Sequence, residues 1–241
     1  MSDVGADSEE AVARPLDPVV ESATDLAMGR LAHLTLHDFA NQVGEPLPGA
    51  GGGSVAAYSG SMAAALVDMV CRLTADKERD GSPGEGLRST CAVAETLRSR
   101  LLAAVDADAD AYLEVVEAYR LPRDTVEERA ARDAAVAAAT RRAAEVPLAS
   151  AEACLEVLEL ARGLSAAFMT AAASELAVAV QAAMVGVHGG AVNVAINLQY
   201  LEQDLDVEEM RRRMAEIEQR ADEAFAVVWP ILRDLSAGTS G

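Results

Sequence analysis

The chain has 241 residues, enough for one domain with a tail, and 51% of them are hydrophobic, which is enough for a sizeable core. Its formal net charge of -19 at pH 7 makes nucleic acid and anionic lipid unfavourable partners, because like charges repel. Aromatic residues make up only 3%, and alanine-rich stretches without strand-like alternation predict an all-helical protein, a bundle with long apolar central helices.

The first 33 residues are acidic and polar, which predicts a flexible N-terminal tail (residues 1–33) followed by a single helical domain over residues 34–236. The tail has no basic segment followed by an apolar core, so no signal peptide is expected and the protein is predicted to be cytoplasmic. The cysteines Cys71, Cys91 and Cys154 form no CxxC pair and have no ligand spacing with the histidines. They are expected to be reduced core residues, and no metal site is predicted.

About six to seven helices are expected in the domain, separated by turns that contain glycine or proline. A capping box at Thr125 and Glu128 starts one of them, and the turn His188-Gly189-Gly190 is expected to end another. The predicted bounds are about Leu36–Val43, Ser54–Lys77, Leu87–Arg120, Thr125–Gly163 with a break or kink at Pro147, Ser165–Val187, Ala191–Leu201, and Val207–Leu235 with a bend at Pro230.

The helices over Ser54–Lys77 and Ser165–Val187 are unusually apolar. They rely on alanine, which is only weakly hydrophobic, and they contain Asp68 and Glu175, so we do not expect them to span a membrane. Helices of this kind are covered on all sides, either by other helices of the bundle or by a dimer partner.

A glycine-rich loop, Gly49 to Gly53, leads into one of these helices, with Ser54 as its expected N-cap. Free backbone N–H groups and the positive end of the helix dipole favour an anionic or polar ligand at such a place. The loop lacks the Gly-Lys-Ser/Thr of a nucleotide P-loop. A ligand-binding loop and a plain loop with a cap both fit the sequence.

Asp108 lies on the apolar stripe of the helix over Leu87–Arg120, between Val105 and Tyr112. A carboxylate in such a place is desolvated, which raises its pKa and suits it to general acid–base catalysis. Asp106 and Asp110 flank it, and their negative charges shift the pKa in the same direction. The alternative is a structural aspartate bonded to a loop or to an arginine.

Three further polar residues are candidates for ligand binding. Asn193 and Asn197 are four residues apart in an apolar run, so they share a helix face, where they either bind a ligand or tie helices together. Lys77 is the only lysine in the chain, which fits either a retained titratable cation or an ordinary solvated side chain.

These segments occur in an order that resembles a known family. The matching stretches are Phe39–Thr74 with its Pro-Gly-Ala-Gly-Gly-Gly-Ser loop, Val105–Tyr112 with its Asp-x-Asp segment, Arg120–Arg123 with a Leu-Pro turn, Ala144–Leu148, and Asn193–Leu198. The family is the cyclodeaminase domain of formiminotransferase-cyclodeaminase, together with the stand-alone methenyltetrahydrofolate cyclohydrolase. The resemblance covers about residues 36–205.

The resemblance implies an all-helical homodimer that uses an aspartate as acid/base on a folate-bound carbon and needs no metal or other cofactor. Where the family shows an aspartate in the helix over Ser165–Val187, this chain has Glu175. The residues that match the family's site are Asp106 and Asp108 for the acidic pair, Gly51, Gly52, Gly53 and Ser54 for the folate-side loop, Lys77 for its lysine-containing stretch, and Asn193 and Asn197 for its asparagines.

The expected activity is cyclodeamination of 5-formimidoyltetrahydrofolate to 5,10-methenyltetrahydrofolate and ammonia, with Asp108 as the acid that protonates the departing nitrogen. Methenyltetrahydrofolate cyclohydrolase chemistry is the close alternative. A non-catalytic relative that binds a ligand or acts as a scaffold is the alternative from another class.

Overall fold

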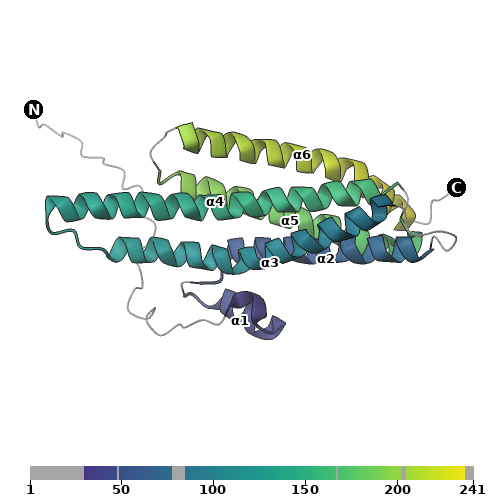
Figure 1. Cartoon of the computed structure of the whole chain (residues 1–241), viewed down its shortest axis with the longest axis horizontal. Coiled ribbons are helices and arrows are strands. Elements are labelled where there is room, and N and C mark those ends of the chain that lie inside the picture. Colours follow the sequence, from purple (N-terminus) through teal and green to yellow (C-terminus); the bar gives the residue numbers. More distant parts are fainter. Residues whose placement is uncertain (1–29, 48, 78–84, 167, 202–204, 237–241) are drawn as a thin grey trace, which may run out of the picture.

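The computed structural model of the chain describes residues 30–47, 49–77, 85–166, 168–201 and 205–236. Every regular element in these ranges is a helix, so the predicted all-α fold is confirmed (Figure 1). The elements are η2 (Leu31–His33), α1 (Leu36–Gly44), α2 (Gly52–Lys77), α3 (Glu85–Arg120), α4 (Val126–Leu164), η3 (Thr170–Ala172), α5 (Ala173–Leu198) and α6 (Leu205–Ser236).

Helices α2 to α5 form an up-and-down bundle that closes through contacts between α2 and α5, and α6 packs against α4 and α5. In Figure 1, α3 and α4 lie in front of α2 and α5, and their connected ends project beyond the other helices. Neighbouring helices run in opposite directions: Ser54 at the start of α2 meets Asp108 far along α3, whereas Cys71 near the end of α2 bonds to Leu87 at the start of α3.

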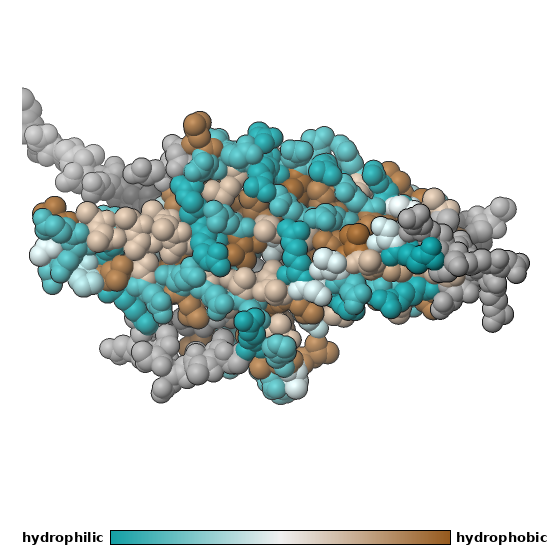
Figure 2. All heavy atoms as spheres, viewed as in Figure 1, coloured by the Kyte–Doolittle hydropathy of each residue, from teal (hydrophilic) through white to brown (hydrophobic). Residues whose placement is uncertain are grey.

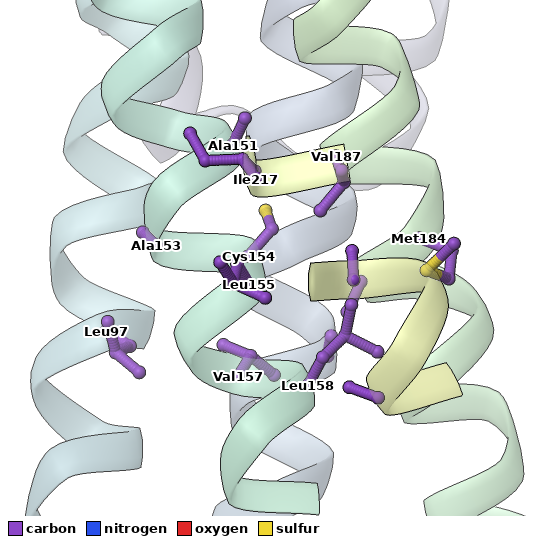
Figure 3. Packing of buried hydrophobic residues seen from close by; sticks show 14 of the residues in the cluster. Leu97, Ala151, Ala153, Cys154, Leu155, Val157, Leu158, Met184, Val187 and Ile217 are labelled. Atoms are coloured by element: carbon purple, nitrogen blue, oxygen red, sulfur yellow. The ribbon is translucent and has the colours of Figure 1, made fainter. Parts of the chain in front are cut away.

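The core depends on small residues that allow the helices to approach closely. Cys154 of α4 points between the helices with Leu158 and Val187 (Figure 3). A Cβ atom added at Gly60 or Gly186 would overlap its sulfur. Burial raises the pKa of the Cys154 thiol to about 12, so this cysteine stays protonated at neutral pH. Each fully buried leucine, such as Leu158, stabilises the fold by about 1.5–3 kcal/mol.

Helix α4 begins with the predicted capping box. The Thr125 hydroxyl accepts a bond from the Glu128 N–H (3.1 Å), and the Glu128 carboxylate accepts one from the Thr125 N–H (2.9 Å). Of the break or kink predicted at Pro147, the break is wrong, because α4 continues to Leu164. Pro147 has no N–H to donate to the carbonyl of Ala143, one turn earlier, and the side chain of Asn197 donates to that carbonyl instead (2.9 Å).

Helix α5 also runs through a predicted break. The turn expected at His188-Gly189-Gly190 is wrong, because both glycines lie inside α5. Their role is close packing: a Cβ at Gly189 would lie 2.8 Å from the Cβ of Ala56, and one at Gly190 would lie 3.0 Å from the carbonyl oxygen of Pro147. The helix starts at Ala173, eight residues later than predicted.

The segment before α2 packs against the side of the bundle. Leu31 of η2 is 4% exposed and joins a small apolar cluster with Ala57 of α2 and Val105 of α3. Leu31–His33, predicted as the end of the tail, therefore contact the body. Residues 1–29 of the predicted tail lie outside the described residues.

By length and composition, two segments could cross a membrane, Gly52–Ala75 and Thr170–Leu198, a test that core helices of soluble proteins also pass. Both segments pack against other helices of the bundle, and we keep the prediction that they are core helices. Figure 2 shows hydrophilic residues spread among apolar ones on the face that α3, α4 and α6 present. Surface ion pairs such as Arg212 with Glu209 (2.7 Å) contribute to this polarity.

Candidate functional site

The glycine loop and the start of α2 form one wall of a cavity. The loop turns at Gly49, whose φ of 142° favours glycine, and α2 begins at Gly52. The Val55 N–H donates to the Gly51 carbonyl (3.0 Å), which places Gly51 at the N-cap. The expectation that Ser54 caps this helix is wrong, because Ser54 lies within its first turn and its hydroxyl points to α3.

Asp108 of α3 lies directly beneath this first turn. The Ser54 hydroxyl donates to Oδ2 of Asp108 (2.9 Å) and lies 3.2 Å from the Val105 carbonyl oxygen. The carboxylate is so close to the backbone of Gly53 that a Cβ there would overlap it. Burial raises the pKa of Asp108, and hydrogen bonding from Ser54 opposes that shift. The result is a desolvated carboxyl group that opens onto the cavity and is held in a fixed orientation.

The opposite wall carries Asn193 and Asn197 of α5. The Asn193 side chain donates to the Gly189 carbonyl (2.7 Å), and Asn197 donates to the carbonyls of Ala143 (2.9 Å) and Asn193 (3.0 Å). Within the described residues no donor bonds to either Oδ1 atom, which leaves both oxygens as acceptors. Asn197 therefore ties α5 to α4, whereas Asn193 bonds within its own helix. Both asparagines line the cavity, and their binding of a ligand stays a prediction.

The cavity has a volume of about 410 Å³, within the usual size of a small-molecule site. Polar groups of Asp108, Asn193 and Asn197 line one part of the cavity, and apolar and tyrosine side chains line the rest. Its lining residues are Gly49 to Gly53 of the loop and of α2, Asp108, Tyr112, Val115 and Tyr119 of α3, Thr140 and Ala143 of α4, Asn193, Ile196 and Asn197 of α5, and Tyr200 just after α5.

Asp106 does not line this cavity. It is 9% exposed and accepts a long bond from the N–H of Ala32 in η2 (3.4 Å). The two aspartates of the Asp-x-Asp segment therefore point to different neighbours, since residues two apart on a helix do not share a face. Helix η2 covers Asp106 on this side.

Lys77 and Glu175 lie at the other end of the bundle. Lys77 ends α2, about 37 Å along its axis from Gly52 at roughly 1.5 Å per residue. Glu175 is in the first turn of α5, about 27 Å before Asn193 at the same rise per residue, and it accepts a bond from the Ser174 hydroxyl (2.7 Å). The structure of one chain does not bring these two residues to the cavity, which corrects their prediction as part of the same site.

The lining residues with a hydroxyl group were not predicted as site residues: Tyr112, Tyr119, Thr140 and Tyr200. Tyr112 and Tyr119 lie on the apolar stripe of Asp108, so helix periodicity could have placed them. Burial raises the pKa of the Tyr112 hydroxyl, which keeps it protonated at neutral pH. Thr140 stands in an alanine-rich helix, and no sequence pattern distinguishes it. Among the described residues, no group of three or more His, Cys, Asp or Glu could hold a metal ion.

Comparisons with known proteins agree with this architecture. The sequence profile described as Formiminotransferase-cyclodeaminase matches residues 35–216. The crystal structure of formiminotetrahydrofolate cyclodeaminase from Thermotoga maritima superposes with a TM-score of 0.73 at 24% identity, over 85% of this chain and 98% of that one. At that identity the similarity establishes the fold.

Two relatives cover most of this chain. Methenyltetrahydrofolate cyclohydrolase from Methylorubrum extorquens is 36% identical over 193 residues, which are 80% of this chain and 91% of that protein. Formimidoyltransferase-cyclodeaminase from Sus scrofa is 33% identical over 82% of this chain, but only 37% of that protein is covered. The chain therefore belongs to the formiminotransferase-cyclodeaminase family, the cyclodeaminases and cyclohydrolases of folate one-carbon metabolism.

Proposed function

We propose that this protein moves protons at the one-carbon bridge of a tetrahydrofolate derivative, with Asp108 as the general acid and base. The observation that carries the proposal is the Asp108 carboxyl group itself, which lies partly buried beneath Gly53, is bonded to Ser54 and opens onto the cavity. A raised pKa brings such a group closer to the pH at which it can both take up and release a proton.

The reaction that we favour is that of a methenyltetrahydrofolate cyclohydrolase. Water adds to the methenyl carbon while the Asp108 carboxylate accepts one of its protons. The bond between this carbon and N5 then breaks as protonated Asp108 returns the proton to N5. The hydroxyl group on the carbon releases its own proton to solvent, which leaves the formyl group on N10. The support is the Methylorubrum extorquens cyclohydrolase, of which 91% aligns with this chain.

Cyclodeamination, the reaction expected from the sequence, is the second candidate. N10 attacks the carbon of the formimidoyl group on N5, and the proton of N10 passes to the formimidoyl nitrogen. Protonated Asp108 gives a second proton to this nitrogen, which departs as ammonia. Methenyltetrahydrofolate is the product of this reaction and the substrate of the other, so one site of this kind suits both. The support is the set of relatives named cyclodeaminases.

The remaining cavity residues have roles that follow from their chemistry. The N–H groups at the start of α2 and the Oδ1 atoms of Asn193 and Asn197 would bind polar edges of the ligand, and Tyr119 and Tyr200 would contact its rings. We propose that the reaction needs no metal or other cofactor. We also propose that the enzyme is cytoplasmic and binds neither nucleic acid nor membrane.

We further propose that the protein is a homodimer that buries α2 and α5. Val178, Val185 and Val192 recur every seven residues along α5 and are each more than half exposed. On the adjacent α2, Met62 and Met69 are 43% and 38% exposed. Apolar side chains repeated in this way on neighbouring helices are typical of a protein–protein contact.

An absorbance assay with methenyl- and formimidoyl-tetrahydrofolate tests the function. Because 5,10-methenyltetrahydrofolate absorbs in the near ultraviolet, its loss reports cyclohydrolase activity and its appearance reports cyclodeaminase activity. We expect loss of this absorbance at a rate above that of buffer. If neither substrate turns over, the enzyme proposal fails and the ligand-binding relative takes its place.

A further inference from the structure

Thr140 of α4 has a hydroxyl group without a partner in a nearly buried place. The residue is 4% exposed and lines the cavity. The described threonines Thr74, Thr90 and Thr96 all donate to the carbonyl one turn earlier in their helices, at 2.8–3.0 Å. The Thr140 hydroxyl makes no such bond, nor any other within the described residues. A hydroxyl group at the wall of a cavity with no protein partner is available to a ligand, to which it can both donate and accept a hydrogen bond.

The position of Thr140 relative to Asp108 follows from a chain of contacts. Asp108 lies under Gly53, and a Cβ at the neighbouring Gly52 would lie 3.9 Å from Nδ2 of Asn193. Asn197 is one turn further along α5 and bonds to the carbonyl of Ala143, which is on the same turn of α4 as Thr140. Asp108, Asn193, Asn197 and Thr140 therefore follow one another as polar residues along the cavity.

We propose that Thr140 is a specificity-determining residue whose hydroxyl, together with Oδ1 of Asn197, binds the amide edge of the substrate's pterin ring. The inference rests on the proposed function, in which the one-carbon bridge of a folate lies at Asp108. The far edge of the pterin carries a carbonyl, a ring N–H and an amino group. The Thr140 hydroxyl donates to the carbonyl, and Oδ1 of Asn197 accepts from the N–H or the amino group.

Thr140→Val tests this, because valine keeps the shape of threonine and removes only the hydroxyl. We expect the Kd for tetrahydrofolate, measured by titration calorimetry, to rise about tenfold, the usual scale for one lost hydrogen bond in a buried site. In turnover KM should rise similarly while kcat changes less than about threefold. Thr140→Ser should restore binding, and the matched control Thr96→Val, at an exposed site on α3, should bind as the parent does.

The pterin assignment has a test of its own. 6-Methyltetrahydropterin contains the ring and lacks the aminobenzoyl group, so Thr140→Val should weaken its binding by the same factor. If the parent does not bind 6-methyltetrahydropterin at millimolar concentration, or the variant binds it equally well, Thr140 does not contact the pterin.

The outcomes also separate the inference from the proposed function. A parent that binds and turns over folate while Thr140→Val matches it in Kd and KM overturns the inference alone. A parent that binds tetrahydrofolate and turns over neither substrate overturns the enzyme proposal, and the Kd of the variant still decides the inference. A parent that does not bind tetrahydrofolate overturns both.

Discussion

The Ser54 hydroxyl donates a 2.9 Å hydrogen bond to Oδ2 of Asp108, joining the first turn of α2 to the middle of α3. The bond fixes the orientation of the carboxylate and favours its charged form, whereas burial favours the neutral form and has the larger effect on the pKa. The net effect is a raised pKa, the direction that suits an acid/base residue.

Asp108→Asn should abolish most of the activity and keep the fold, because the two side chains have nearly the same shape. We expect kcat to fall about a hundredfold or more, the usual scale for a lost general acid or base. Asp110→Asn, on the exposed side of the same helix, is the control and should retain turnover. Full activity in Asp108→Asn, with circular dichroism like that of the parent, would assign the chemistry to another group.

Stability should depend on pH through Asp108. The pKa of this carboxyl is raised above its ordinary value of 3.8 in the folded protein, so the unfolded chain loses the proton first as the pH rises. The free energy of unfolding therefore falls as the pH increases from about 3.8 through the raised pKa. The free energy of urea unfolding of Asp108→Asn, minus that of the parent, should increase between about pH 4 and pH 7. The same difference for Asp110→Asn should not increase. A constant difference across this range would show that burial of Asp108 carries no such cost.

Two adjacent glycines should differ sharply in their tolerance of alanine. In Gly53→Ala the new Cβ overlaps the Asp108 carboxylate, so we expect at least a tenfold loss of kcat and a destabilisation of about 1–3 kcal/mol. In Gly52→Ala the nearest atom is Nδ2 of Asn193 at 3.9 Å, an ordinary contact, and the stability should change by less than about 0.5 kcal/mol. Kinetics and urea unfolding of the pair measure this, and equal effects would contradict the placement of Asp108 beneath Gly53.

The sequence predicted the all-helical fold, the capping box at Thr125 and the inward face of Asp108, because all three depend on local propensity or on helix periodicity. It did not predict that α4 passes Pro147 without a break or that α5 continues past Gly189. Both residues break isolated helices, and here tertiary contacts compensate for them: Asn197 bonds the carbonyl that Pro147 leaves free, and Ala56 packs where a larger residue at Gly189 would not fit. Such long-range partners leave no local signal.

The same limit applies to the site. The family resemblance grouped Lys77 and Glu175 with Asp108. The length of the predicted helix over Ser54–Lys77 already places Lys77 far from the glycine loop, whereas the separation of Glu175 from Asn193 follows only once α5 is seen to be one unbroken helix. Thr140 went unpredicted for a related reason. Its significance lies in a hydrogen bond that it does not make, and only the packed structure shows this.

A charge placed in the apolar stripe of α5 should dissociate the proposed homodimer. Val185→Asp puts a carboxylate in the middle of that stripe, so we expect light scattering at micromolar concentration to shift from a dimer to a monomer. Val227→Asp on α6 is the matched control, because Val227 is 51% exposed and lies outside the stripe, and this variant should stay dimeric. A parent that is monomeric at this concentration would disprove the dimer.

The link between Asn197 and Pro147 can be measured with a double-mutant cycle. In Asn197→Leu the carbonyl of Ala143 loses its donor, and Pro147 cannot replace it, so we expect a loss of about 1–3 kcal/mol in the free energy of urea unfolding. In a Pro147→Ala background the new N–H can donate to that carbonyl within the helix, so the same Asn197→Leu change should cost at least about 1 kcal/mol less. Asn193→Leu is the control, because Asn193 bonds to Gly189 in its own helix, and its cost should not depend on residue 147. Additive effects of Asn197→Leu and Pro147→Ala would mean that the Ala143 carbonyl finds another partner, and Asn197 would then be retained for the ligand rather than for α4.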